Sequence, residues 1–339
     1  MKARRAALAS CLLAGALLAA GTALPAQGAP RAASVPAGAS GARAAESCPP
    51  QPVPLTQEDV RAGLREAQDS GFLWRATRDG HASYLYATIH AAERAWMFPG
   101  PQVMDALRAS ETVMLELDPT DADTIARLQR ALAPVAGDAP LPADLAHRMA
   151  AQARVACLPE QVLGSLRPEM GAITLEVLSG RRLGLQPAYG VDAFLAQLTR
   201  GAGKPLRALE TPEAQAALLV NDDPAVTRRI VREMLEELES GEASRVLVRL
   251  AQDWRHGNLE DLADYRAWCD CVKTPEQQRD LVRFIDERNP HMAEQVVRAH
   301  AGGKRLFVAV GSLHLVGPRG VPELLRHEGF IVERVHLGP

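Results

Sequence analysis

The sequence has few aromatic residues, no concentration of one charge, and no long apolar run after its first 20 residues. Phe, Trp and Tyr make up 4% of its 339 residues, which leaves little material for stacking bases or sugars. Acidic and basic residues are mixed throughout, with a net charge of −3, so no basic stripe is available to neutralise phosphates. We therefore predict an aliphatic core and no nucleic-acid partner.

Two common catalytic motifs are also absent. The chain has no Gly-x-Ser-x-Gly nucleophile elbow, which excludes the usual serine-hydrolase arrangement. It has no Gly-x-x-x-x-Gly-Lys loop, which excludes the usual phosphate cradle of nucleotide-binding proteins. Any enzymatic chemistry must come from another set of residues.

The N-terminus has the pattern of an export signal. Basic residues at Lys2 and Arg4 are followed by an apolar stretch from Ala6 to Ala20 and then by small residues. We predict a signal peptide over residues 1–29, the alternative being a retained anchor, because the apolar stretch is short for a bilayer span. The mature protein would then be periplasmic or secreted, with no membrane span left after cleavage.

The rest of the chain divides by composition into two parts. Residues 30–54 are rich in Ala, Gly, Pro and Ser, and they cannot bury enough apolar surface to offset the entropy of ordering. We predict a disordered leader there. Residues 55–339 are predicted to form one α/β domain.

Four cysteines remain after removal of the predicted signal peptide: Cys48, Cys157, Cys269 and Cys271. In an oxidising compartment this number fits two disulfides, with three possible connectivities. We expect Cys48 to be tied to Cys157, Cys269 or Cys271, because a direct Cys269 to Cys271 bridge closes a very small loop. A metal or redox role for Cys269 and Cys271 is the alternative, but a second ligand pair at metal spacing is lacking.

The pattern of apolar residues and turn signals predicts a fold with strands at both ends. An Asp-Gly turn at Asp79 and Gly80 indicates a hairpin, and Thr211 with Pro212 marks the start of a helix. The predicted strands are 73–77, 84–89, 112–117, 204–210, 306–310 and 331–336. The predicted helices are 101–110, several within 124–195, 225–265, 275–301 and 321–328. We predict an α/β fold with a central mixed sheet built from N- and C-terminal strands and a large helical insertion between them.

Two of the predicted strands end in the same way. The segments 86–90 and 310–314 each carry a small residue three positions before a histidine, His90 and His314. Neighbouring strands of this kind would place both imidazoles at the carboxyl edge of the sheet, where α/β proteins commonly build their sites. The alternative for each histidine is an ordinary packing or surface role.

Glu116 lies within an otherwise apolar strand, where a carboxylate is costly to bury unless it is paired or bound to a metal. Two imidazoles and one carboxylate are typical ligands of a catalytic metal ion with an open position for water. We therefore predict a metal site at His90, Glu116 and His314. An edge-strand carboxylate facing water is the alternative for Glu116.

Several segments resemble, in order, the conserved blocks of TraB/GumN proteins. The main blocks are residues 85–90, 114–118 and 310–317, and the secondary blocks are 189–192, 209–215 and 287–290. The resemblance covers the chain from Phe72 to its end. That family includes the animal TIKI proteins, which act as metal-dependent proteases, and it resembles erythromycin esterases and ChaN-like proteins in fold.

Carried over residue by residue, the resemblance implies that His90, Glu116 and His314 form the site. Its first motif is normally Gly-x-x-His, whereas this chain has Ala87, whose Cβ could crowd a close backbone approach. We expect the geometry to survive, since alanine is the smallest alternative. A site that has lost its catalytic activity remains the alternative for a chain with alanine at this position.

Three further residues are weaker candidates. Glu210 is a candidate catalytic base or a carboxylate that favours the following helix dipole. Arg288 is a candidate for polarising a substrate carbonyl, or it pairs with Asp286, Glu287 or another acid. Asp192 either contacts substrate or holds Tyr189 or the loop backbone.

These observations support three functional hypotheses. The first is an exported metal-dependent peptidase that uses a divalent ion such as Mn, Co or Zn to activate water, with catalytic roles for Glu116, Glu210 and Arg288. The second is a metal-free, esterase-like hydrolase with the same residues and a histidine as general base. The third is a protein that binds a peptide or a haem-like ligand without turnover. A peptide or small molecule is the expected partner in each, and the oligomeric state is not predicted.

Overall fold

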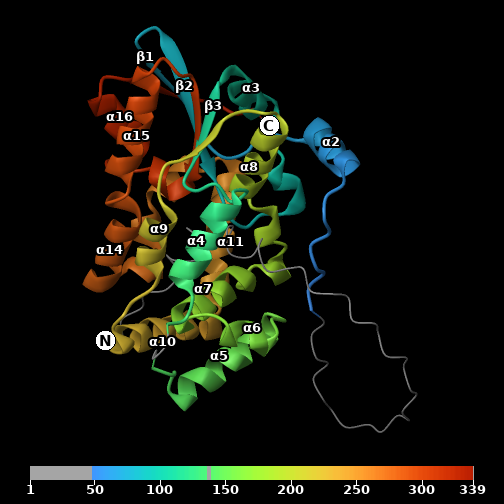
Figure 1. Ribbon diagram of the computed structural model, residues 1–339, viewed down its shortest axis with the longest axis vertical. Coiled ribbons are helices and arrows are strands. Elements are labelled where there is room, and N and C mark those ends of the chain that lie inside the picture. Colours follow the sequence, from blue (N-terminus) through green and yellow to red (C-terminus); the bar gives the residue numbers. More distant parts are fainter. Residues whose placement is uncertain (1–47, 136–138, 339) are drawn as a thin grey trace.

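The architecture is a six-stranded mixed sheet with helices around it, seen in a computed structural model that describes residues 48–135 and 139–338 (Figure 1). The strand order is β4-β3-β5-β2-β1-β6. The strands are β1 (Leu73–Arg78), β2 (His81–Thr88), β3 (Thr112–Leu115), β4 (Leu206–Ala208), β5 (Leu306–Gly311) and β6 (Ile331–Val335). Strands from both ends of the chain thus share one sheet, and the predicted fold class is confirmed.

The C-terminal strand β5 lies in the interior of the sheet, between two N-terminal strands. It pairs in parallel with β2 on one side and with β3 on the other. All six of its residues are buried, which explains why its sequence is a continuous apolar run rather than an alternating one. The carboxyl ends of β2, β3 and β5 therefore meet at the same edge.

The hairpin between β1 and β2 has the predicted two-residue turn. Arg78 pairs with His81, which leaves Asp79 and Gly80 as the loop. Both loop residues have positive φ, 52° and 79°, as the favoured hairpin turns require. The Asp-Gly dipeptide is suited to this conformation because glycine has no Cβ and aspartate tolerates the left-handed region.

Helices fill most of the chain between β3 and β5, as predicted. They are α4 (Ala122–Leu132), α5 (Ala143–Val155), α6 (Glu160–Gly164), α7 (Pro168–Ser179), α8 (Val191–Gly201), α9 (Pro212–Leu219), α10 (Pro224–Ser240), α11 (Glu242–His256), α12 (Leu259–Ala263), α13 (Tyr265–Trp268), α14 (Pro275–Leu281) and α15 (Asn289–Ala301). The others are α2 (Gln57–Glu66), α3 (Pro101–Ala109) and α16 (Val321–His327). In Figure 1, α5, α6 and α10 gather at the end of the molecule opposite the β1–β2 hairpin.

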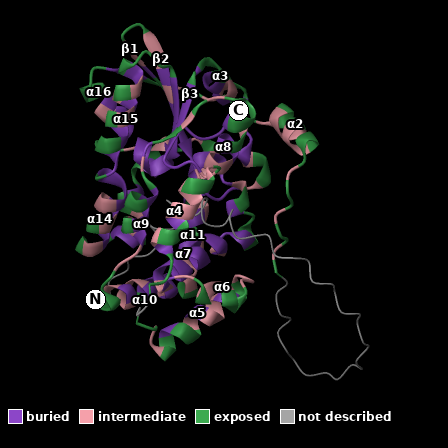
Figure 2. Ribbon diagram, in the orientation of Figure 1, coloured by how far each residue is buried: buried purple, intermediate pink, exposed green. Residues whose placement is uncertain are grey.

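The core runs from the sheet into the helical insertion without a break. Helix α7 is its most enclosed helix, since every residue from Glu169 to Leu178 is buried (Figure 2). A helix that is apolar around most of its circumference is expected in such a position. The large buried side chains include Trp254, Tyr86 and Phe307, and most of the rest are aliphatic, as the low aromatic content predicts.

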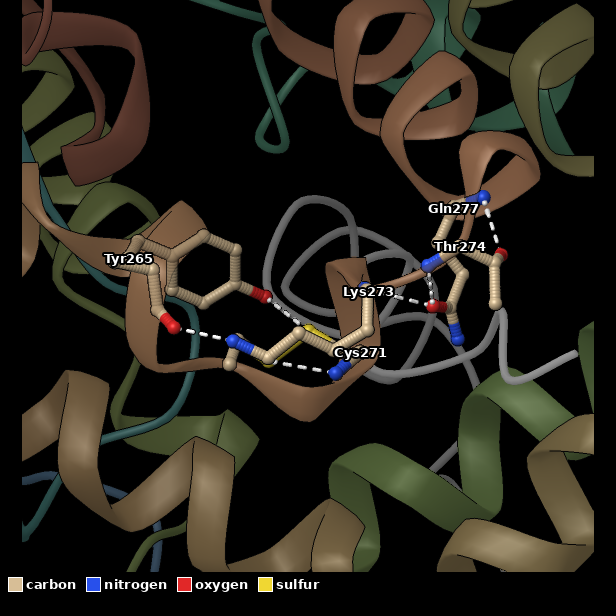
Figure 3. Close-up of a disulfide and its surroundings, with 7 residues drawn as sticks. Tyr265, Cys271, Lys273, Thr274 and Gln277 are labelled. Atoms are coloured by element: carbon tan, nitrogen blue, oxygen red, sulfur yellow. Dashed lines mark hydrogen bonds between the residues drawn. A yellow bond between two sulfur atoms is a disulfide. The ribbon is translucent and has the colours of Figure 1, made fainter.

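The four cysteines form two disulfides, Cys48–Cys157 and Cys269–Cys271. The first confirms that Cys48 is tied to the body of the domain. The expectation against a Cys269–Cys271 bridge was wrong. A short turn over Asp270–Val272 brings the two Cα atoms to 5.1 Å, within the usual range for disulfides, and the Cys271 N–H donates to Cys269 Sγ (Figure 3).

The predicted signal peptide, residues 1–29, and most of the predicted leader lie outside the described residues. The described end of the leader, residues 48–54, is held by the Cys48–Cys157 disulfide and by a hydrogen bond from Gln186 Nε2 to the Pro50 carbonyl. Within residues 48–135 and 139–338, no helix combines the length and apolar character that a bilayer span needs.

Candidate active site

The two histidines of the repeated motif follow adjacent parallel strands. In the β2–β5 ladder Thr88 lies opposite Gly311, and these are the last residues of the two strands. His90 comes two residues after β2, and His314 lies in the short 3-10 helix Ser312–Leu315 directly after β5. Both imidazoles are buried at the same edge of the sheet.

Glu116 reaches this edge from the other side of β5. It follows β3, and its Oε1 accepts a hydrogen bond of 2.7 Å from the Gly311 N–H. A Cβ placed on Gly311 would lie 3.2 Å from Glu116 Oε1, 3.6 Å from His314 Cδ2 and 3.9 Å from His90 Nε2. Gly311 is therefore the point where the three side chains meet, and its lack of a side chain gives them room.

Arg288 joins the carboxylates of this cluster. Its Nη2 donates to Glu116 Oε2 at 2.6 Å, and its Nε donates to Glu210 Oε1 at 2.8 Å. Burial alone would lower the pKa of Arg288, but Glu116 and Glu210 outweigh it and hold the pKa above its ordinary value. The guanidinium is thus a fixed cation. Of the acids proposed as alternative partners, Asp286 instead pairs with Arg266.

The backbone before Arg288 is irregular. Residues Val282–Asp286 form a single π-helical turn, and Arg288 then precedes α15 as its N-cap residue. The extra residue of a π turn redirects the side chains that follow it, and such turns are frequent at functional sites. Here the Phe284 carbonyl in that turn accepts a hydrogen bond of 3.0 Å from Arg288 Nη1.

His314 is held as a neutral imidazole. Its Nδ1 lies 2.6 Å from Asn289 Oδ1, whose amide orientation is fixed because Asn289 Nδ2 donates to the Arg319 carbonyl. Nδ1 must therefore carry the proton, which leaves a lone pair on Nε2, 3.1 Å from Arg288 Nη1. Burial and the Arg288 cation lower the pKa of His314 well below its ordinary value.

His90 has a different environment. Its Nδ1 forms an ion pair with Asp192 Oδ1 at 3.1 Å, whereas its Nε2 has no hydrogen-bond partner among the described residues. Burial alone would lower the pKa of His90, but the nearby Asp192 carboxylate outweighs it and raises the pKa to about 9. Asp192 therefore acts on a site residue, rather than on Tyr189 as one alternative expected.

Glu210 lies beside Glu116 because β4 pairs in parallel with β3. The Glu210 N–H donates to the Glu116 carbonyl at 3.0 Å, which continues the pairing of the two strands beyond their ends. Gln215 Nε2 donates to Glu210 Oε2 at 3.0 Å from the first turns of α9. The structure thus brings together all five predicted site residues: His90, Glu116, Glu210, Arg288 and His314.

Sequence reasoning gave no role to Gln215 or Asn289, which hold Glu210 and His314. Gln215 lies in the secondary block 209–215 and Asn289 in the block 287–290. Their place in these blocks was the sequence feature that could have drawn attention to them. Their contacts depend on helices that meet only in the folded chain. No local pattern reveals them.

Ala87 does not distort the site. Its φ is not positive, its N–H donates to the Phe72 carbonyl at 2.9 Å, and its carbonyl accepts from Trp254 Nε1 at 2.8 Å. The Cβ is fully buried in the core without a need for glycine at this position. The expectation that the geometry survives is consistent with these contacts.

The imidazole and carboxylate groups at this edge are donors of the kind that metal ions bind. They are not, however, already arranged as a ligand set. Within residues 48–135 and 139–338, no three His, Cys, Asp or Glu side chains are arranged as ion ligands. Arg288 contacts two of the three predicted ligands, Glu116 and His314. His90 Nε2, buried and without a partner in the described part of the chain, is the atom that most directly fits an added ligand.

The fold and the clustered polar residues at the carboxyl edge define an α/β protein with an enzyme-like site. The family model for TraB/PrgY/gumN proteins matches residues 72–334, and the chain belongs to the TraB/PrgY/gumN family. The predicted family membership is confirmed.

Three curated relatives match the chain. The metalloprotease TIKI1 of Danio rerio is 25% identical over 329 residues, which cover 82% of this chain and 66% of TIKI1, just under two thirds of its length. The proteins called YbaP of Shigella flexneri and Escherichia coli, described as uncharacterized, are each 26% identical over 75% of this chain and 97% of their own length. No solved structure gives a significant match.

Proposed function

We propose that the chain is an exported hydrolase that cleaves a peptide or a related acyl compound with the help of a divalent metal ion. The observation that carries the proposal is His90, whose buried Nε2 has no hydrogen-bond partner among the described residues and adjoins Glu116, while Nδ1 faces Asp192. A buried polar group without a partner costs free energy, so a ligand at this position would offset that cost. The similarity to a metalloprotease supports the same reading.

The ion would be held by His90, Glu116 and His314. His314 Nε2 carries no proton in the present tautomer, but Arg288 Nη1 would have to withdraw from it. His90 would have to give up its proton, as metal ligation by imidazole requires. When bound, such an ion polarises a carbonyl oxygen and makes water more acidic. Mn, Co and Zn all accept nitrogen and oxygen ligands of this kind.

The remaining polar residues have roles that follow from their contacts. Arg288 is a buried, fixed cation whose N–H groups are engaged by Glu116, Glu210, His314 and the Phe284 carbonyl, so it would position these side chains and stabilise nearby negative charge through its own charge. Glu210 fixes the plane of the guanidinium through two hydrogen bonds. Glu116 is the carboxylate placed to accept a proton from water, since it adjoins both histidines.

A metal-free hydrolase is the second candidate, and one observation favours it. His314 is neutral, it is oriented by Asn289, and its Nε2 lone pair is free to accept a proton if Arg288 shifts toward substrate. A base oriented by a second residue is the usual arrangement for activating water or a hydroxyl group. The same five residues would then act without an ion.

Export rests on the basic and apolar N-terminal sequence and on two disulfides, which persist in oxidising compartments. The experiment that tests the function uses the full chain, expressed with its N-terminus and purified from the periplasm. A broad peptide library is incubated with wild type, His314→Ala and His327→Ala, the last being a control because His327 is exposed on α16.

We expect cleavage by wild type and His327→Ala, loss of cleavage in His314→Ala, loss on exhaustive chelation, and rescue by one divalent ion. Cleavage that persists through chelation would select the metal-free candidate. A protein that cleaves nothing yet gains thermal stability with a peptide or haem would reject hydrolysis in favour of binding.

A further inference from the structure

An apolar pocket opens directly beside His90. Its walls are formed mainly by Leu247, Leu250 and Ala251 of α11, Leu262 of α12, and Ile89 and Leu313 from the ends of β2 and β5. The space is small and partly open to solvent. Gly311, the point where His90, Glu116 and His314 meet, also borders it.

The sequence of α11 builds one wall of this pocket. Leu247, Leu250 and Ala251 are spaced i, i+3 and i+4, so they share one face of the helix. The helix is fixed to the end of β2 because Trp254 Nε1 donates to the Ala87 carbonyl at 2.8 Å. The Gly71 N–H, at a φ of 79°, donates to the Trp254 carbonyl, and a Cβ on Gly71 would lie only 2.5 Å from the indole.

Two buried polar side chains that border the pocket each have an atom without a hydrogen-bond partner in the described part of the chain. They are His90, with Nε2, and Thr88, with Oγ1. Ser312, the third polar residue of the lining, is already engaged, since its Oγ donates to the Thr88 carbonyl at 2.8 Å. Ligand pockets are typically apolar with a few such polar groups that fix orientation.

We propose that this pocket is the specificity subsite of the enzyme and that it takes an aliphatic side chain, such as leucine or methionine, next to the bond that is cleaved. Thr88 Oγ1 hydrogen-bonds the substrate backbone there. The role of the pocket in selecting the cleaved bond rests on the proposed hydrolytic function. Binding of an aliphatic side chain in the pocket does not depend on that function.

The lining explains the choice of an aliphatic side chain. A charged side chain would lose its hydration against the leucine and alanine walls of the pocket. A small side chain would leave the leucines in contact with water. Each buried methylene of a ligand strengthens binding in such a pocket, by tenfold or more in enzymes that discriminate this way.

The test compares peptides that carry Leu, Ala, Asp or Lys at each position, with the full-length mature protein as enzyme. Wild type is expected to prefer Leu to Ala at one position by about tenfold or more in kcat/KM. Ala251→Leu adds bulk inside the pocket and is expected to abolish or reverse that preference. Val248→Leu is the matched control, because Val248 lies on the same helix outside the lining and should keep the wild-type preference.

A second readout separates failure of the subsite from failure of the hydrolase. Methyl resonances of Leu250 and Leu262 are recorded while N-acetyl-leucine amide or N-acetyl-alanine amide is added. Leucine-selective shifts without any peptide cleavage would reject the hydrolase and retain the pocket. Cleavage without an aliphatic preference, unchanged by Ala251→Leu in a protein that keeps its melting temperature, would overturn the subsite and leave the hydrolase standing.

Discussion

Arg288 Nη2 lies 2.6 Å from Glu116 Oε2, across 172 residues of sequence and at the junction of β3, β5 and the start of α15. The contact is buried on both sides. It links the strand that carries Glu116 to the segment that also supplies Asn289 for His314. The candidate site is therefore held together by this one cation.

Replacing Arg288 by methionine should destabilise the protein strongly. Glu116 and Glu210 would be left buried without their counter-ion, which typically costs about 3 to 5 kcal/mol. Urea denaturation measures the loss. Adding Glu210→Gln to Arg288→Met should recover part of it, because one uncompensated carboxylate is removed.

Arg266→Met is the control for this variant. Arg266 also pairs with a carboxylate, that of Asp286, but its own side chain is half exposed. Only one buried carboxylate, that of Asp286, loses its partner here, and solvent reaches the pair, so the expected cost is clearly smaller than for Arg288→Met. Equal losses in Arg266→Met and Arg288→Met would show that the Arg288 cluster is no more than a surface ion pair.

Gly311→Ala should reduce activity far more than stability. The new Cβ would lie 3.2 Å from Glu116 Oε1 and push the carboxylate away from the histidines. The carboxylate has to move by a few tenths of an ångström, and because misplacement by about 1 Å can cost about 100-fold in rate, a smaller loss is expected here. The measurement is kcat/KM on the peptide cleaved best by wild type, with the melting temperature recorded in parallel.

Gly164→Ala serves as the comparison for Gly311→Ala. Gly164 lies in α6 with open space around its Cβ position, so alanine there should be neutral or slightly stabilising. Wild-type activity in Gly311→Ala would contradict the convergence of the three side chains at that residue.

The two disulfides should contribute very differently to stability. The Cys48–Cys157 bridge closes a loop with a sequence separation of 109, and restriction of the unfolded chain should stabilise the fold by about 4 kcal/mol. The Cys269–Cys271 bridge, with a separation of 2, should stabilise it much less. Paired serine variants of each bridge, compared in urea, test this. A larger loss from the second pair would contradict the entropic account.

Stability should also fall as the pH drops below 6.5. His300 is fully buried, its Nδ1 accepts from Ser83 Oγ, and its Nε2 donates to the Arg78 carbonyl. Burial lowers the pKa of His300 from 6.5, so below this pH the unfolded chain binds a proton that the folded chain does not. His314, whose pKa is also lowered, contributes in the same direction, so His300→Gln should reduce the decrease between pH 7 and 5 in urea titrations without removing it. The exposed His327→Gln should leave it unchanged.

Local sequence signals predicted much of the fold because they have local physical causes. The Asp79-Gly80 turn, the Thr211 cap and the continuous apolar run of β5 each depend on a few neighbouring residues. The Cys269–Cys271 bridge was judged from loop size alone, and the tight turn that permits it depends on its surroundings.

The site was predicted less completely for a related reason. His90, Glu116 and His314 end strands, and strand ends share an edge in any parallel sheet. The contacts of Arg288 with two acids and of Asp192 with His90 require helices and loops to meet in three dimensions. No periodicity in the sequence encodes such pairings. Only the family resemblance, or the general acid–base character of the side chains, pointed to Arg288 and Asp192.

The most direct test of the account is the divalent-metal stoichiometry of the protein purified from the periplasm, measured for wild type and for the double variant His90→Ala, His314→Ala. Wild type is expected to hold close to one ion per chain and the double variant none, with both proteins folded by circular dichroism. Full metal occupancy in the double variant would contradict the proposed metal site.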